Sequence, residues 1–155
     1  MHQDSVTSET HVADVKNPFG LVIEFQHSPI APEEMRSREA FYKEVIWVVD
    51  GLRGDLDLSF FRMGLSGPIQ QSPLAYQVQW LGRGQLLRNW AEAKAKVYLD
   101  FGENVLWRLV LYDAERKIGV VGPVLRDAFI RDCLTGKAIH VTENGPQLPA
   151  PLIQV

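Results

Sequence analysis

HVADVKNPFGLVIEFQ, the stretch from residue 11 to residue 26, has the pattern of two short β-strands joined by a turn. Residues 11–15 and 21–26 are rich in apolar and β-branched side chains, and the residues between them include Asn, Pro and Gly, which favour turns. Because side chains alternate along a strand, Glu24 and Gln26 share one face with Val22, and the other face carries Leu21, Ile23 and Phe25. The stretch therefore predicts a hairpin that presents two polar groups beside an apolar core.

A helix and a buried strand are expected directly after this hairpin. Residues 32–43 begin with Pro32 and two acids, which favour a helix start. Residues 45–50, VIWVVD, form a continuous apolar run that is typical of a strand covered on both faces. Weaker patterns predict a short helix and a loop at 66–73 within an insertion over 54–76, strands over 97–101, 105–112 and 117–121, and helices over 86–93 and 124–134. We therefore expect an α/β domain with a mixed central β-sheet flanked by helices.

Length and composition fit one domain. The chain has 155 residues, of which 46% are hydrophobic, enough for a single ordinary core. We expect this domain over residues 10–143, a mobile N-terminus over 1–9, and an extended or disordered tail over 144–155, which contains three prolines after a polar start. Cys133 is the only cysteine and is expected to be a small buried hydrophobe.

The net charge and the N-terminal residues bear on which partners and which location we expect for the protein. The net charge of −3 and the isoelectric point near 5.8 argue against a protein with a uniform basic surface for nucleic acid, but not against a local basic groove. We find no apolar run of membrane-spanning length, and the polar first residues do not have the layout of a signal peptide. The expected location is the cytoplasm.

Asp14 and Glu24 form the most suggestive pair of side chains. A hairpin that turns near Pro18 places Asp14 opposite about residue 22, diagonal to Glu24, at a typical backbone separation of roughly 7–8 Å. Two carboxylates at this spacing can bind one Mg²⁺ ion, which prefers oxygen ligands and often uses only one or two protein carboxylates. The competing interpretation is that both side chains simply face water from a half-buried strand.

A longer pattern favours the metal site. It comprises Ala13–Val15, Val22–Ile30, Pro32–Glu34, Arg38, Tyr42, Trp47–Asp50, Lys96–Gly102 and Leu106–Leu109. This pattern resembles the nuclease domain of the CoiA-like competence family. That family is similar to PD-(D/E)XK nucleases. In it, the final Lys of the motif is replaced by Gln, as at Gln26.

The resemblance implies a restriction-endonuclease-like core and metal-dependent hydrolysis of DNA phosphodiester bonds, in single- or double-stranded DNA. It implies Mg²⁺, with Mn²⁺ as a substitute, bound by Asp14 and Glu24, and Gln26 in the place where related nucleases hold the attacking water. A neutral amide cannot act as a proton-transfer group near neutral pH, so the metal must supply most of the activation.

Nucleases of this fold usually open with a helix, which is expected to be missing here. This expectation leaves three alternatives to a self-sufficient enzyme. The sequence is truncated and inactive without the helix, or the site is completed by Glu9 or by another subunit, as in a homodimer, or the chain is a non-catalytic DNA-binding or protein-interaction module with a truncated nuclease fold.

Several neighbouring side chains are candidates for supporting roles. Arg38 and Tyr42 share a helix face with Glu34. Arg38 either binds a phosphate or steadies a ligand carboxylate, or it forms a surface ion pair with Glu34 while Tyr42 packs in the core. His27 points to the opposite face of the strand from Gln26, so a structural role is favoured over that of a general base. Candidates for a phosphate-contacting rim, or alternatively a solvated face, are Lys94, Lys96 and Arg108.

Overall fold

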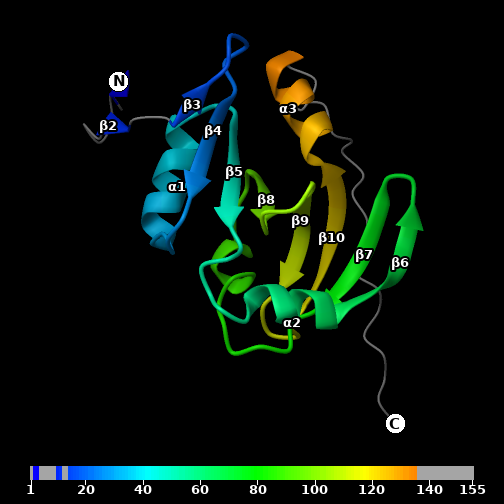
Figure 1. The fold of residues 1–155 in the computed structure, drawn as a ribbon. Coiled ribbons are helices and arrows are strands. Elements are labelled where there is room, and N and C mark those ends of the chain that lie inside the picture. The colour runs from blue at the N-terminus through cyan, green and yellow to red at the C-terminus, as the bar shows by residue number, and fades with distance from the viewer. Residues whose placement is uncertain (1, 4–9, 12–13, 136–155) are drawn as a thin grey trace.

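The computed structural model describes residues 2–3, 10–11 and 14–135, which form a mixed β-sheet with helices on both faces (Figure 1). The strands of these residues are β1 (His2–Gln3), β2 (Thr10–His11), β3 (Val15–Lys16), β4 (Val22–Gln26), β5 (Val45–Asp50), β6 (Leu65–Gln71), β7 (Leu74–Gln79), β8 (Lys96–Asp100), β9 (Val105–Asp113) and β10 (Ile118–Leu125). The helices are α1 (Pro32–Phe41), α2 (Asp57–Gly64) and α3 (Arg126–Thr135), and Arg88–Trp90 form the short 3₁₀ helix η1.

The main sheet has eight strands in the order β3-β4-β5-β8-β9-β10-β7-β6. β4, β5 and β8 run parallel to one another, and every other neighbouring pair is antiparallel. α1 connects β4 to β5, as parallel neighbours require a crossover connection. The expected α/β class, with a mixed sheet flanked by helices, is confirmed. A separate two-stranded sheet pairs β1 with β2.

The sheet has an apolar core on each face. One core contains Met35 from α1 and Phe61 from α2, packed with Trp47 from the middle of β5. The other contains Phe129 from α3, whose ring lies 4.8 Å from the ring of Tyr98 on β8. Both faces of the central strands are therefore covered, which explains why residues 45–49 are continuously apolar.

The hairpin of β3 and β4 is organised by one buried side chain, Asn17. Its Oδ1 accepts hydrogen bonds from the backbone N–H groups of Phe19 and Leu21, and its Nδ2 donates to the carbonyl oxygen of Cys133 on α3. Gly20 has a φ angle of +92°, which only glycine adopts without strain. This turn holds the start of β4 against α3 and sets the pairing of β3 with β4.

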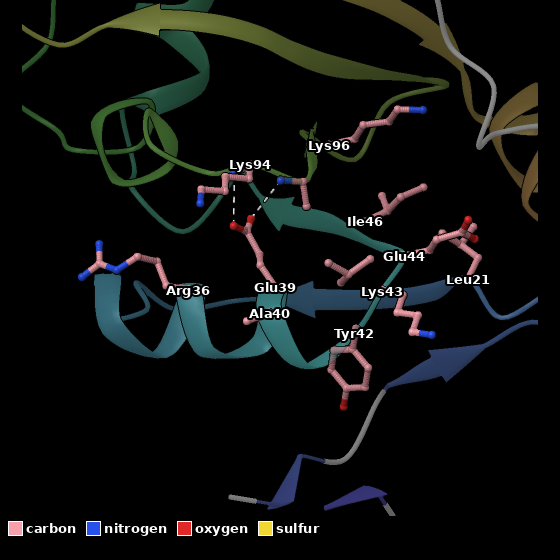
Figure 2. Close-up of a pocket in the computed structure, with 12 residues that line it drawn as sticks. Leu21, Arg36, Glu39, Ala40, Tyr42, Lys43, Glu44, Ile46, Lys94 and Lys96 are labelled. Atoms are coloured by element: carbon pink, nitrogen blue, oxygen red, sulfur yellow. Dashed lines mark hydrogen bonds between the residues drawn. The ribbon is translucent and has the colours of Figure 1, made fainter. Parts of the chain in front are cut away.

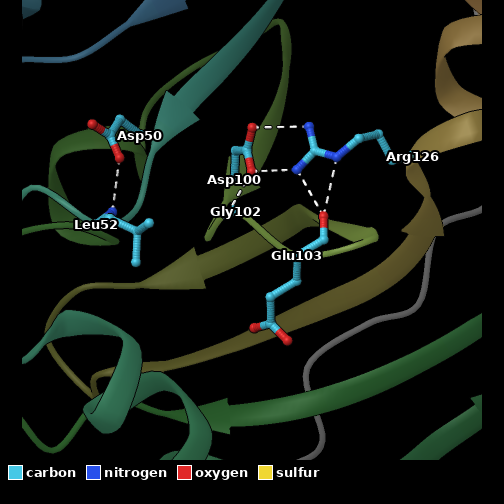
Figure 3. Close-up of polar contacts among 6 residues, drawn as sticks. All are labelled: Asp50, Leu52, Asp100, Gly102, Glu103 and Arg126. Carbon is cyan, nitrogen blue, oxygen red and sulfur yellow. Dashed lines mark hydrogen bonds and ion pairs between the residues drawn. The ribbon is translucent and has the colours of Figure 1, made fainter.

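An ion pair ties the end of the parallel strands to α3 (Figure 3). Arg126 donates to both carboxylate oxygens of Asp100, at 2.6 and 3.1 Å, and twice to the carbonyl oxygen of Glu103. Asp100 also accepts the backbone N–H of Gly102, whose φ angle is +74°. The hydrogen bonds from Arg126 hold the pKa of Asp100 below its usual value. The turn between β8 and β9 is therefore locked to the helix.

Several expected boundaries need correction. The loop expected at residues 66–73 is strand β6, which pairs with β7 to extend the sheet as a projecting hairpin (Figure 1). Pro68 is compatible with β6 because this is an edge strand, and its pairing with β7 shifts register on both sides of that proline. The expected helix over 86–93 is only η1, and β3 is shorter than the strand expected over 11–15.

Other expectations agree with the structure within a few residues. The helix expected over 32–43 ends at Phe41, and the last helix begins at Arg126, after β10. The strands expected over 45–50, 97–101 and 105–112 are β5, β8 and β9. Among the described residues, no helix combines the length and apolar character needed to cross a bilayer. The expected N-terminal segment 1–9 and the tail 144–155 lie largely or wholly outside the described residues.

Candidate metal centre

Glu24 is a charged side chain in the middle of the sheet. It lies on β4 directly beside Trp47 of β5, and only 1% of its surface is exposed. Its Oε2 accepts a hydrogen bond from Nη1 of Arg38 at 3.3 Å. Its Oε1 is buried and accepts no hydrogen bond in the described part of the chain. A buried carboxylate oxygen without a partner is costly, so this atom is suited to a further ligand.

Asp14 lies directly across from Glu24, whereas the sequence predicts a diagonal placement. β3 and β4 pair Val15 with Ile23 and Lys16 with Val22, so extending this register places Asp14 opposite Glu24 rather than diagonal to it. The shift arises because the turn around Asn17 closes at residue 21, later than the turn expected from the sequence. Asp14 is exposed, in contrast to Glu24.

One oxygen of Asp14 has a structural partner. Its Oδ2 accepts the backbone N–H of Phe25 at 2.8 Å, at a point where β3 no longer supplies a backbone partner. No hydrogen bond to Oδ1 is found among the described residues. The side chain is thus fixed beside β4 while one oxygen remains open to a ligand.

The two carboxyl groups influence each other. Burial raises the pKa of Glu24 to about 6, Arg38 opposes this shift, and both the charge of Asp14 and its contact with Glu24 add to it. The folded protein therefore disfavours two negative charges at this position. A divalent cation would reverse this preference because it favours the ionised form of both ligands.

Arg38 joins this pair to the surface of α1. Its Nη2 donates to Oε1 of Glu34 at 2.7 Å while Nη1 donates to Oε2 of Glu24, so the expected ion pair with Glu34 is present together with a hydrogen bond to Glu24. Tyr42 is buried, with its ring packed edge-on against Phe41. Burial raises the pKa of Tyr42, and the negative charge of Glu24 adds to that shift. Arg38 is thus positioned to orient Glu24 and to balance its charge.

Gln26 lies two residues further along β4, on the same face as Glu24. Its Nε2 donates to the carbonyl oxygen of Ser28 at 2.7 Å, which fixes the amide with its oxygen free of any donor in residues 14–135. His27 is largely exposed, and its Nδ1 lies 3.6 Å from Oδ2 of Asp50. Both side chains line a cleft of about 250 Å³ at the carboxyl ends of β4 and β5.

Glu39 is a half-buried anchor of the site that was not among the residues predicted from the sequence. Its Oε1 accepts a hydrogen bond from Nε1 of Trp47. Its Oε1 also accepts the backbone N–H of Ala95, and its Oε2 accepts the backbone N–H of Lys94 (Figure 2). The signal was its spacing of one helical turn from the buried Met35, which places a carboxylate on the inner face of α1. Glu39 fixes α1 against β5 and β8, and thereby the position of Arg38.

The donor set fits a hard cation held by few protein ligands. Within residues 14–135, no three His, Cys, Asp or Glu side chains gather as a metal site. Asp14 and Glu24 supply two carboxylates, which is the number Mg²⁺ commonly takes when a substrate and water complete its shell. Glu9, the further acid considered from the sequence, lies outside the described residues.

No family model, curated protein or solved structure matches this chain.

Proposed function

We propose that this chain is a Mg²⁺-dependent nuclease that hydrolyses DNA phosphodiester bonds, of the PD-(D/E)XK type and similar to the CoiA-like competence nucleases. The observation that carries the proposal is the buried Glu24, which faces Asp14 and keeps one oxygen without a hydrogen-bond partner among the described residues. A carboxylate that served only the fold would be expected to have its buried oxygens satisfied.

In this proposal, Asp14 and Glu24 hold the cation, with Mn²⁺ as a substitute. The cation supplies Lewis acidity, which polarises the scissile phosphate and makes water easier to ionise. Arg38 keeps Glu24 oriented and limits its protonation, since the guanidinium lowers the pKa of that carboxyl. Asp14 and Glu24 thus form the position at which the cation would bind.

Gln26 has the role of positioning water. Its amide nitrogen is occupied by Ser28, so its oxygen can accept a hydrogen bond from a water molecule at the same sheet face as Glu24. An amide neither removes a proton at neutral pH nor contributes positive charge. The reaction therefore depends more on the cation than it would with Lys at this position.

The test is a cleavage assay on single- and double-stranded DNA with Mg²⁺, with Mn²⁺ and with a chelator. Glu24→Gln and Asp14→Asn are expected to reduce cleavage by at least about 100-fold, because each removes a charged ligand. Glu34→Gln is the matched control, since Glu34 is an exposed carboxylate bonded to the same Arg38. Cleavage that survives Glu24→Gln, or that is lost equally in Glu34→Gln, would contradict the assignment.

The alternative is a non-catalytic DNA-binding or protein-interaction module with the same fold. The observation in its favour is that the described residues offer only two carboxylates and a neutral Gln at the site. Calorimetric titration with Mn²⁺ and Mg²⁺ separates the two proposals. Cation binding that Glu24→Gln abolishes supports the nuclease, whereas DNA binding with no cation binding supports the module.

A further inference from the structure

Arg108 is a cation without a counter-ion in the described part of the chain. It lies on β9, is half-buried, and its Nε is fully buried with no hydrogen-bond partner. No carboxylate within residues 14–135 forms an ion pair with it. Taking a charged group partly out of water without a partner is costly, so proteins usually supply a counter-charge or bind one.

A second cation, Lys96, lies next to Arg108. β8 and β9 pair Tyr98 with Arg108, and Lys96 is two residues before Tyr98, so Lys96 and Arg108 share one face of neighbouring strands. Burial lowers the pKa of Lys96, and the charge of Arg108 lowers it further against a smaller opposite effect from Glu44. The sheet thus holds two positive charges close together.

Both residues line a small cleft of about 110 Å³ at the start of β8. None of the residues that line this cleft is acidic, since the charged ones are Lys94, Lys96 and Arg108. Polar atoms form most of its exposed wall. A polar cleft with cations and no acids is suited to an oxyanion.

Lys94 differs from the other two cations. Figure 2 shows its side chain leaving the start of β8 in the direction opposite to that of Lys96. It is exposed, whereas Lys96 is half-buried. The three-residue rim considered from the sequence therefore separates into a half-buried pair, Lys96 and Arg108, and an exposed lysine of the same cleft whose side chain points away from Lys96 (Figure 2).

We propose that Lys96 and Arg108 form a phosphate-binding subsite that binds the backbone of a nucleic-acid strand. This subsite is separate from the carboxylates of Asp14 and Glu24. The choice of DNA as the source of the phosphate rests on the proposed function. The subsite gives a protein of net charge −3 a local attraction for a polyanion. A bound phosphate would give Arg108 the counter-charge that it lacks in the described part of the chain.

The test measures the affinity of the full chain for a labelled single-stranded oligonucleotide by fluorescence anisotropy, in chelator, over a range of salt concentrations. For single strands, each neutralised phosphate contact changes the slope of log affinity against log salt by about 0.7. Lys96→Gln/Arg108→Gln is therefore expected to make the slope shallower by about 1.4, because two contacts are lost. Arg108→Lys retains the charge and should keep most of the slope.

The matched control is Arg62→Gln/Arg131→Gln, which removes two charges from α2 and α3 outside the cleft. A slope unchanged in Lys96→Gln/Arg108→Gln, or changed equally in Arg62→Gln/Arg131→Gln, overturns the proposal. A second arm titrates inorganic phosphate alone. Phosphate binding that depends on Lys96 and Arg108, without any effect on DNA binding, overturns DNA as the source.

Failure here is distinguishable from failure of the proposed function. The subsite is measured as binding without a divalent cation, whereas the nuclease is measured as cation-dependent cleavage that needs Glu24. A shallower slope with no cleavage would retain the subsite and remove the enzyme. Cation-dependent cleavage with an unchanged slope would retain the enzyme and remove the subsite.

Discussion

Replacing Glu24 with Gln should change how the stability of the protein depends on pH. The pKa of Glu24 is raised from 4.5 to about 6 in the folded protein, mainly by burial. For a group whose pKa is raised by folding, the associated stability is fully present below the unfolded pKa and is lost as pH rises through the folded pKa. The rise in the pKa from 4.5 to about 6 corresponds to about 2 kcal/mol, since a tenfold change in a proton affinity is worth about 1.36 kcal/mol.

Gln resembles the protonated form of Glu24, so the variant does not undergo this loss. Glu24→Gln should have nearly the wild-type free energy of unfolding near pH 4, apart from a constant offset, and gain about 2 kcal/mol relative to wild type by pH 7.5. For a domain of this size, the gain corresponds to a rise in melting temperature of about 4–8 °C. Most of the change should occur between pH 4.5 and about 6.

The assay is urea denaturation in chelator, followed by tryptophan fluorescence, at several pH values from 4 to 7.5. Trp47 lies directly beside Glu24, so its emission reports on this region. Comparing wild type with the variant at each pH cancels the titration of all other groups. Glu34→Gln shows what the loss of an ion pair with Arg38 does without removing the buried acid. A difference between wild type and Glu24→Gln that stays constant from pH 4 to 7.5 would refute the assigned shift.

Three further substitutions test the fold that holds the site. Arg126→Gln should lower the free energy of unfolding at pH 7 by about 1.5 kcal/mol, measured by urea denaturation, because it removes charge-assisted hydrogen bonds. The pKa of Asp100 is lowered in the folded protein, so the part of this difference that comes from the Asp100 carboxylate should be lost as pH falls through that pKa, and the part that comes from the bonds to the carbonyl oxygen of Glu103 should remain; a difference of unchanged size in strong acid would contradict the assigned shift. Glu39→Gln should cost about 2 kcal/mol by the same measurement, since one amide oxygen cannot accept all three N–H groups. Gly64→Ala should lower the free energy of unfolding by about 3 kcal/mol, because its new methyl group would overlap the carbonyl oxygen of Gln79 on β7. The control Gly67→Ala has open space around the new methyl group and should be near neutral. Equal melting temperatures for the two variants would refute this prediction.

Sequence periodicity was sufficient for the central part of the fold. Residues 45–50 form a buried strand because their apolar side chains serve both faces of the sheet. Pro32 and the acids after it mark the start of α1. These signals are local, so they can be read without knowing which elements become neighbours.

The projecting hairpin could not be predicted in the same way. Residues 66–73 contain Gly, Ser and Pro, which locally favour a loop, yet they pair with β7. Their strand conformation depends on β7 being held by β10, a contact between segments far apart in the sequence. Tertiary pairing here overrides local preference.

In the candidate site too, features set by local strand geometry were predicted, and features set by tertiary contacts were not. The alternation of β4 placed Glu24 and Gln26 on one face correctly, because strand geometry is local. Whether Glu24 faced water or protein was not decided by that pattern, since its burial depends on α1 and β5. The exact register of Asp14 depended on the side-chain contacts of Asn17, which no propensity scale contains.

Pro68 has a consequence for how the protein behaves at high concentration. The segment from Leu65 to Gln79 carries no charged side chain, and Ile69 is exposed on the strand that ends the sheet. An uncharged outer strand is a template onto which another molecule can add its own strand and begin a fibril. Pro68 has no N–H to offer such a strand, and the irregular pairing around it twists the edge out of register. Resistance to aggregation at this end of the molecule therefore rests on one imino acid rather than on electrostatic repulsion.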